Sequence, residues 1–570
     1  MKTLTRRGFR ALALAATVAA LPLVAANAQT AWQTAGNGTF GNTANWTNGV
    51  PVAGVPVTLP TVGVSAVTVT VNGANYNAQS LLTNGTTAYT LVDDGTSRTV
   101  TLPGANTINS GATLGVSGSA GNRNVTLTSA SLSVDGALNI VSSGRVISTG
   151  ATTITGTMNY ASNGLLQTNT LSGTGTINNT GTAIGQLNIG ADSTFAGNIT
   201  SANGAISKQG VGRLTLTGTA SLGAQSTIAG GSVQIGDGVT NGAFTGAISV
   251  SGSSGLLFNQ ASAYTFTGNL ASTGTVTQNG AAITLSSESL NPNFVVSAGK
   301  SLSVAHLSRS GTAQTVQNTG AFTLDTTGTK ISGATISGVG TVTKTGTGSF
   351  TLNGAQTYTG ATTVSSGTLK FGAVSASTDF SVAQNATLDF SGVAPATGAK
   401  IVSAGAVLNV GGTFAAGAGS VIGGTAFGGN LSVADGGTVS PGNSPGTLAI
   451  TGSFAMSGGT YTVELASLSS FDVIAATGSA TFTGGTFNVV TLGAFNPIIG
   501  DFFDIVTTGT GISGTGSVTV PTGYTFAPSG NNGRLTFVGI AVVPEAGSGL
   551  LAVLGGGCSV LGGVVLRRRK

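Results

Sequence analysis

The sequence predicts an all-β protein: an elongated right-handed single-stranded β-helix (a β-solenoid) with a C-terminal transmembrane helix. Three observations predict it: short runs that alternate apolar and hydroxyl residues, a 32-residue segment that occurs twice, and an uncharged stretch of 20 residues near the C-terminus. The expected organisation is a signal peptide (1–28), an N-terminal cap (29–60), a β-helix body (61–430), a C-terminal β cap or stalk (431–540) and a tail with the membrane helix (541–570).

The composition favours a folded body with few charges. Charged residues make up 6% of the chain, against about 25% in ordinary globular domains. Hydrophobic residues make up 40%, whereas disorder needs low hydrophobicity and high net charge. Eight of the 20 basic residues lie in the first ten and the last four positions, and the other 12 are scattered among 15 acidic residues. A nucleic-acid-binding face needs clustered basic side chains, so we exclude nucleic acid as a partner.

The body consists of short strand patterns separated by glycine. Residues 67–71 read Val-Thr-Val-Thr-Val before Asn72-Gly73, and residues 213–217 read Arg-Leu-Thr-Leu-Thr before Gly218. Alternation with a period of two and many β-branched residues are typical of half-buried strands. Few segments carry helix signals, so we expect strands along the whole body.

One segment of the body occurs twice without a gap, at residues 205–236 and 341–372. The identical pairs include Lys208 with Lys344, Gly210 with Gly346, Gly212 with Gly348, Gly218 with Gly354 and Gly231 with Gly367. A unit this short cannot bury its apolar side alone, so it must stack on neighbouring units. In a solenoid, ladders of Thr, Ser and Asn can hydrogen-bond along the stack, where charges would repel. Separate β-sandwich domains are the alternative architecture.

The N-terminus has the three parts of an export signal. A basic region ends at Arg10, residues 11–24 are apolar, and Ala26 and Ala28 supply small residues at the cleavage positions. This predicts cleavage after Ala28. The paired arginines leave the general secretory and twin-arginine routes open, and an uncleaved N-terminal anchor is the alternative.

The C-terminus also has three parts. Val543-Pro544-Glu545 precedes the uncharged residues 547–566, which are long enough to span a hydrocarbon core of ~30 Å as a helix. The basic cluster follows at once and consists of Arg567, Arg568, Arg569 and Lys570. Because positive charge stays on the cytoplasmic side, we expect a stop-transfer anchor in the inner membrane.

This tail resembles the PEP-CTERM sorting signal of Gram-negative bacteria, which combines a Pro-Glu motif, a membrane helix and a basic cluster. The resemblance covers residues 543–570, and Ala546 stands where the family has a second proline. It implies that an exosortase-like sorting protease recognises the tail and removes it during delivery to the cell surface. A plain C-terminal anchor that is never cut is the alternative.

The second copy of the repeat resembles the autotransporter-associated β-strand repeat. Its marks are Lys344-Thr345-Gly346, Tyr358-Thr359-Gly360 and Gly367-Thr368-Leu369, whereas the first copy has Leu222-Gly223-Ala224 in its centre. The resemblance implies a β-helical passenger of a surface protein, with extracellular polysaccharide among its partners.

Aromatic residues near both ends of the body indicate caps. Trp32 and Trp46 are expected to close the first coil, because an open coil exposes unpaired edges; a sugar-stacking site is the alternative. Residues 495–505 (FNPIIGDFFDI) are expected to form the C-terminal cap and stalk.

The sequence contains few motifs that are typical of catalytic sites. Residues 442–446 fit G-x-S-x-G, but Pro445 has no N–H for an oxyanion hole, and His306 is the sole histidine. Asp93 and Asp94 are adjacent, so on a strand they would face opposite sides, and before Gly95 they are expected to form a hairpin turn. We therefore expect no enzymatic activity, no cofactor and no metal.

These observations together predict an exported, non-enzymatic structural or adhesive protein of the cell surface or extracellular matrix. The expected partners are the export machinery, an exosortase-like protease, extracellular polysaccharide, and the inner membrane through the tail. A β-helical polysaccharide-processing enzyme and an uncleaved, membrane-anchored periplasmic β-helix protein are the alternatives.

Overall fold

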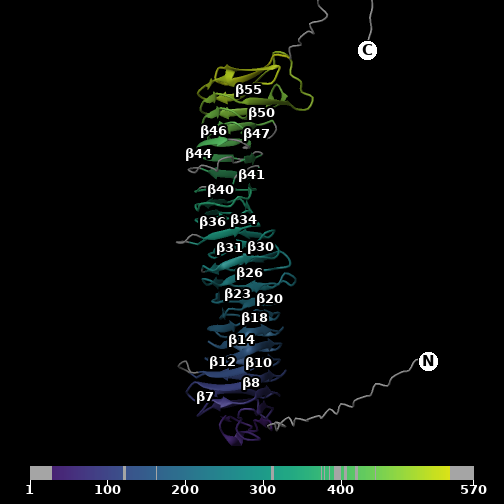
Figure 1. Ribbon diagram of the computed structural model, residues 1–570, viewed down its shortest axis with the longest axis vertical. Coiled ribbons are helices and arrows are strands. Elements are labelled where there is room, and N and C mark those ends of the chain that lie inside the picture. Colours follow the sequence, from purple (N-terminus) through teal and green to yellow (C-terminus); the bar gives the residue numbers. More distant parts are fainter. Residues whose placement is uncertain are drawn as a thin grey trace, which may run out of the picture. The chain divides into compact units, whose positions relative to one another are not determined.

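A computed structural model describes residues 28–539, apart from 120–123, 162, 272, 310–313, 374, 378, 384–385, 391–399, 404–406, 417–420 and 443–444. The chain divides into two compact units, Met1–Arg309 and Ser310–Lys570. Within each unit, short strands stack as the successive rungs of a β-solenoid of the right-handed type (Figure 1). The predicted β-solenoid of the body is therefore confirmed, and the described residues do not form separate β-sandwich domains.

The first unit begins with two long parallel sheets. Sheet 1 contains β1 (Thr30–Ala31), β3 (Pro56–Leu59), β6 (Ser80–Thr83), β8 (Arg98–Ile108), β10 (Val125–Val134), β12 (Arg145–Ile154), β14 (Leu165–Ser172), β16 (Ile184–Ile189), β19 (Ala205–Gln209), β22 (Ser226–Ile228), β25 (Ile248–Val250) and β28 (Leu270–Ala271), and β5 (Tyr76–Asn77) pairs with β8. Sheet 2 contains β2 (Gly38–Thr39), β4 (Ala66–Val71), β7 (Ala88–Asp93), β9 (Thr113–Ser117), β11 (Ala137–Val141), β13 (Thr157–Tyr160), β15 (Thr176–Asn179), β18 (Asn198–Ser201), β21 (Thr219–Leu222) and β24 (Ala243–Thr245).

Two further rows of strands form in the later part of this unit. The first row is β17 (Ser193–Phe195), β20 (Arg213–Leu216), β23 (Ser232–Ile235), β26 (Gly255–Phe258), β29 (Thr275–Gln278) and β31 (Asn293–Val296). The second is β27 (Tyr264–Phe266), β30 (Ile283–Leu285) and β32 (Ser301–Val304). Each coil of the solenoid thus contributes one strand to every row that exists at that point of the unit.

The register of the strands sets the length of a coil. In sheet 1, Arg145 pairs with Leu165, Leu165 with Gln186, and Gln186 with Ser207, so partners lie 20 or 21 positions apart. The pairs are parallel, because the chain runs in the same direction in every coil.

Apolar side chains from successive coils stack in columns and form the core. Side chains of a strand alternate between its two faces, so every second residue points inward. One column of sheet 2 pairs, in order, Leu114, Leu138, Met158, Ile177, Ile199 and Ala220. All six are at most 4% exposed, so the alternation read from the sequence marks the inner face correctly.

Tryptophans lie at the start of the first unit. Trp32 and Trp46 are 1% and 2% exposed, their ring centroids are 5.1 Å apart, and the rings meet edge to face. The Trp46 Nε1–H donates to Phe40 O at 2.8 Å, and the Phe40 ring packs on Trp46 and on Tyr76. Since neither indole presents a face to solvent, this arrangement supports the cap interpretation over a sugar-stacking site.

The second unit continues the same pattern in two sheets. One contains β34 (Ala321–Asp325), β37 (Thr341–Thr345), β39 (Thr362–Val364), β41 (Asp379–Val382), β43 (Lys400–Ser403), β45 (Val421–Gly424), β47 (Thr438–Pro441), β50 (Thr460–Ser467), β51 (Ser470–Phe471) and β54 (Thr486–Thr491). The other contains β35 (Thr329–Ser332), β38 (Ser349–Leu352), β40 (Thr368–Phe371), β42 (Thr387–Phe390), β44 (Val407–Ala416), β46 (Ala426–Val433), β48 (Thr447–Ile450), β49 (Phe454–Met456), β52 (Val473–Ala476), β53 (Ala480–Phe482), β55 (Phe502–Thr508), β56 (Ile512–Ser513), β57 (Tyr524–Ser529) and β58 (Asn532–Phe537). In addition, β33 (Thr315–Asn318) pairs with β36 (Thr335–Ser337).

Antiparallel strands appear at the end of the second unit. β50 pairs with β51, and β58 pairs with both β55 and β57, in antiparallel fashion. Among the described residues, the helices are two short 3-10 turns, η1 (Thr43–Asn45) and η2 (Thr515–Ser517), and no helix is long and apolar enough to cross a membrane. The predicted transmembrane helix at 547–566 lies outside the described residues.

Candidate functional site

The first unit carries a polar groove of about 640 Å³ on the outside of sheet 1. It crosses five neighbouring strands, β12, β14, β16, β19 and β22, and is here called the sheet 1 groove. Its lining residues are Asn124, Ser143, Arg145, Asn163, Leu165, Ile184, Gln186, Ser207, Gln209 and Thr227.

The strand register builds this groove. Arg145, Leu165, Gln186, Ser207 and Thr227 are consecutive partners, so they form one column across five coils. The residue after each of them points inward, because side chains alternate along a strand. These inward residues are Val146, Leu166, Leu187, Lys208 and Ile228, and all are at most 4% exposed. Because these residues pack in the core, the residues before them must point outward, and their side chains form the column.

Sheet 2 carries a second polar surface, a ladder of small side chains. Asn159 Nδ2 donates to Asn139 Oδ1 at 2.8 Å, and Thr200 Oγ1 donates to Asn178 Oδ1 at 3.1 Å. Both contacts join outward residues of adjacent coils. These contacts are of the kind that the sequence predicted for stacked Thr, Ser and Asn, and they pair the side chains with one another within the protein.

The two copies of the repeat each bury a lysine in an apolar column. Lys208 lies between Leu187 and Ile228 and is 3% exposed. Lys344 lies between Leu324 and Val364 and is fully buried. The aliphatic stem of each lysine thus packs in the core while its ammonium reaches a polar corner.

Backbone carbonyl groups surround each ammonium. Lys208 Nζ donates to Gly210 O and Gly230 O, both at 3.0 Å, and to Gly212 O. Lys344 Nζ donates to Thr345 O, to Gly346 O at 2.9 Å, and to Ser366 O at 3.4 Å. Burial lowers the pKa of both lysines to about 8, against a weaker opposing effect of a nearby aspartate.

The glycines that follow these lysines make the corners possible. Gly210 and Gly346 have φ of +76° and +73°, a region that side chains rarely adopt. A Cβ at Gly210 would lie 2.2 Å from Ile189 O, and one at Gly346 would lie 2.3 Å from Thr326 O. The paired glycines of the alignment are therefore required where coils approach each other closely.

The copies differ at the residue in the centre of the repeat. In the second copy, Tyr358 is fully buried, and its hydroxyl lies 2.7 Å from Thr362 Oγ1, which donates to Ser377 Oγ at 3.1 Å. Burial raises the pKa of Tyr358 to about 12. The first copy has Leu222 at the equivalent position, and there an internal apolar cavity of about 40 Å³ is lined by Leu222 and Ser226, among others. The smaller side chain leaves this space unfilled.

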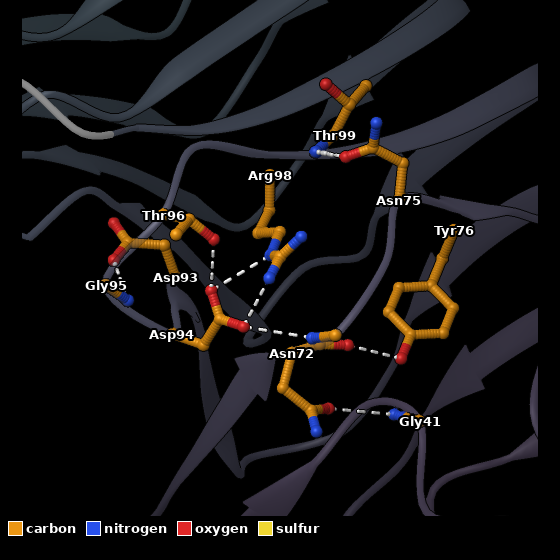
Figure 2. A network of polar contacts seen from close by, with 11 residues as sticks. Gly41, Asn72, Asn75, Tyr76, Asp93, Asp94, Gly95, Thr96, Arg98 and Thr99 are labelled. Atoms are coloured by element: carbon orange, nitrogen blue, oxygen red, sulfur yellow. Dashed lines mark hydrogen bonds and ion pairs between the residues drawn. The ribbon is translucent and has the colours of Figure 1, made fainter.

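The adjacent acids Asp93 and Asp94 lie in a network at a solenoid corner (Figure 2). Asp94 forms an ion pair with Arg98 at 2.5 Å and accepts the Gly73 N–H at 2.9 Å. Asp93 Oδ1 accepts the Gly95 N–H at 2.8 Å. The Arg98 contact lowers the pKa of the Asp94 carboxyl; Asp93 also has a lowered pKa, because hydrogen bonds to its carboxylate outweigh its burial.

The predicted hairpin at these acids is wrong. β7 ends at Asp93 in sheet 2 and β8 begins at Arg98 in sheet 1, and both strands pair in parallel with strands of other coils. The acids therefore hold a corner between two sheets. Asn72 accepts the Gly41 N–H at 3.3 Å, so the network extends over turns of successive coils (Figure 2).

Several residues singled out in the sequence lie elsewhere. His306 is half-buried just after β32, and its Nδ1 lies 3.3 Å from Glu288 O. Ala28 is exposed at the start of the described chain, whereas Ala26 lies outside it. Ser444 also lies outside the described residues, as do Val543, Pro544, Glu545, Arg567, Arg568, Arg569 and Lys570. In the described part of the chain, no three His, Cys, Asp or Glu side chains gather as metal ligands would.

An exposed apolar patch lies near the end of the described chain. Ile498 and Ile499 are 70% and 74% exposed, Phe502 is 51% exposed and Val538 is 47% exposed. The Gly500 N–H donates to Phe537 O at 2.9 Å, so the loop that carries the isoleucines lies against the end of β58. We call these four side chains the C-terminal apolar patch.

Comparison with known proteins bears on the repeat. A model of the passenger-associated-transport-repeat family matches residues 206–235 and 342–371. These matches lie within the two copies predicted at 205–236 and 341–372, so the autotransporter-associated character of the repeat is confirmed. No curated protein matches the chain. The repeats and the solenoid together fit a secreted, passenger-like surface protein.

Proposed function

We propose that this protein is an exported, non-enzymatic structural or adhesive component of the cell surface or extracellular matrix. The single observation that carries the proposal is the repeat of passenger type, built into coils that stack in register. Such a body extends through backbone pairing and presents rows of outward side chains at regular spacing, which suits a scaffold or an adhesin. The expected sorting through an exosortase is part of this proposal.

The surfaces of the first unit support a scaffold more than a catalyst. In the ladder of sheet 2, side chains of adjacent coils bind one another through an amide–amide and a hydroxyl–amide hydrogen bond. The carboxylates of Asp93 and Asp94 bind backbone N–H groups and Arg98, and therefore hold a corner of the coil. Glycoside hydrolysis needs two carboxyl groups about 5–10 Å apart across a cleft, and no acid occurs among the described residues that line the sheet 1 groove.

The C-terminal apolar patch supports the expected anchorage in a membrane. Exposed isoleucine and phenylalanine side chains are costly in water and favourable at a lipid surface. The patch includes Val538, and the uncharged stretch begins at Gly547, only a few residues further along the chain. If that stretch spans the bilayer, this end of the second unit is held near the membrane before the tail is cut.

Intact-mass analysis of surface-extracted protein tests the proposal. We expect a mature N-terminus at Gln29, because signal cleavage follows Ala28, and loss of the tail near Val543. Replacing Pro544 and Glu545 together by alanine should leave the tail attached, whereas Pro521→Ala, outside the motif, should be processed normally. A full-length C-terminus found only in the inner membrane would contradict surface delivery and leave an anchored periplasmic protein.

A further inference from the structure

We propose that the sheet 1 groove binds an extended acidic polysaccharide, with a sugar carboxylate paired to Arg145. This proposal names the class of ligand for the proposed adhesive function. It rests on that function in one respect: the protein must be exported to meet a polysaccharide outside the cell. Its physical basis is the column from Arg145 to Thr227 across five coils.

Arg145 differs from the other arginines that the structure describes. Three of those form ion pairs: Arg98 with Asp94, Arg213 with Asp192, and Arg534 with Asp504. Arg309 Nε donates to the carbonyl oxygen of Asn291 at 2.6 Å. Within the described residues, the Arg145 side chain has no such acceptor, although it lies half-buried in the groove. A planar guanidinium binds a carboxylate through two parallel hydrogen bonds, so a carboxylate ligand would satisfy it.

The neighbouring amides and hydroxyls suit sugar hydroxyl groups. The side chains of Gln186, Gln209, Ser207 and Thr227 have no hydrogen-bond partner within the described residues, in contrast to the self-paired ladder of sheet 2. Amides offer donors and acceptors together, which sugar hydroxyls need. Ile184 is 48% exposed in the groove and offers an apolar contact for the C–H face of a sugar ring.

The dimensions favour an extended chain over a compact ligand. Strands in a sheet lie about 4.8 Å apart, so the column spans roughly 19 Å from β12 to β22. The groove runs across the strands, along the direction in which the coils stack, because its column consists of register partners from successive coils. Its volume of about 640 Å³ lies within the usual range of ligand sites.

The charge selects an acidic ligand. Among the described residues that line the groove, Arg145 is the one that carries a charge, and that charge is positive. A nucleic acid would need several phosphate contacts and stacking groups, and the described lining residues include neither further cations nor aromatic rings. An acidic glycan carries carboxylates, which the Arg145 guanidinium can bind, and hydroxyl groups, which the amides and hydroxyls of the groove can bind.

Binding of polygalacturonate to the protein extracted from cells tests the proposal, with neutral dextran as the comparison and calorimetry as the measurement. We expect polygalacturonate to bind and dextran to bind at least tenfold more weakly. Arg145→Gln should weaken polygalacturonate binding about tenfold, which corresponds to ~1.4 kcal/mol. Arg213→Gln is the matched control, because Arg213 lies outside the groove lining and should leave binding unchanged.

A second variant keeps the test independent of Arg145. Gln186→Glu has nearly the same shape and places a negative charge in the column, so it should also weaken polygalacturonate binding, and added salt should reduce the difference. Equal losses in Arg145→Gln and Arg213→Gln would show diffuse charge attraction and overturn the proposal. Unchanged binding in Arg145→Gln, or no binding of polygalacturonate at all, would do so too. The intact-mass experiment does not involve the groove, so the two proposals can fail separately.

Discussion

Lys208→Met is expected to lower the free energy of unfolding of the first unit by about 3 kcal/mol or more. Methionine can fill most of the space of the lysine stem in the column between Leu187 and Ile228, but it cannot donate to Gly210 O, Gly212 O and Gly230 O. A buried polar group left unsatisfied costs ~1–3 kcal/mol, and three carbonyl groups lose their ammonium donor together. Urea unfolding followed by far-ultraviolet circular dichroism measures the loss.

Lys370→Met is the matched control for this substitution. Lys370 is 39% exposed in its side chain and pairs with Asp389 at 3.5 Å on the surface of the second unit. An exposed ion pair contributes about 0–1 kcal/mol, so this variant should unfold close to the wild-type midpoint. If Lys208→Met proved as stable as Lys370→Met, the buried lysine would not hold the corner of the repeat.

Tyr358→Leu is expected to destabilise the second unit by about 3 kcal/mol. The change opens a cavity among fully packed side chains, a class of substitution that costs ~2–5 kcal/mol. It also removes the hydroxyl that contacts Thr362, which in turn donates to Ser377. Thermal unfolding of the variant beside Tyr358→Phe separates the two effects, because Tyr358→Phe loses only the hydroxyl and should cost about 1 kcal/mol.

The reciprocal substitution in the first copy is expected to stabilise the first unit. Leu222→Tyr should fill part of the 40 Å³ cavity beside Ser226 and raise the free energy of unfolding by about 1 kcal/mol. Destabilisation by both Leu222→Tyr and Tyr358→Leu would mean that each copy is packed around its own residue, and the comparison between the copies would then not explain the cavity.

Much of the fold follows from local pattern. Alternation at residues 67–71 marks the inward Val67, Val69 and Val71, which are all at most 1% exposed. The two copies of the repeat indicate stacking, because each is too short to bury an apolar face alone. The turn at Asp93 and Asp94 was misread because an acid pair before glycine occurs in hairpins and in solenoid corners alike, and only the pairing of distant strands distinguishes them.

The buried lysines could have been found from the sequence. Ile206 and Lys208 are two residues apart, so they share the inner face of one strand, and Lys344 repeats the pattern. In the sequence the interior basic residues stand singly and scattered, and a single lysine gives no local sign of burial, because lysine is seldom buried. The glycines around each lysine are the sequence signal that indicates burial, because their carbonyl groups accept hydrogen bonds from the ammonium at the corner.

The sheet 1 groove could not be predicted in the same way. Arg145, Gln186 and Thr227 lie far apart in sequence, and their alignment depends on coils whose length varies between 20 and 21 residues. A shift of one residue in any coil would turn an outward side chain into the core. Local alternation therefore identifies outward residues, but only the register shows which of them meet.

A crosslinking measurement tests directly whether successive coils stack in register. Asn139 and Asn159 are partners on adjacent coils, so their Cα atoms should be about 4.8 Å apart, within the range of a disulfide. In a Cys558→Ser background, Asn139→Cys with Asn159→Cys should form an internal disulfide on mild oxidation, detected by intact mass. Asn139→Cys with Asn178→Cys, two coils apart, should not. A disulfide in the second pair but not in the first would contradict the stacked solenoid.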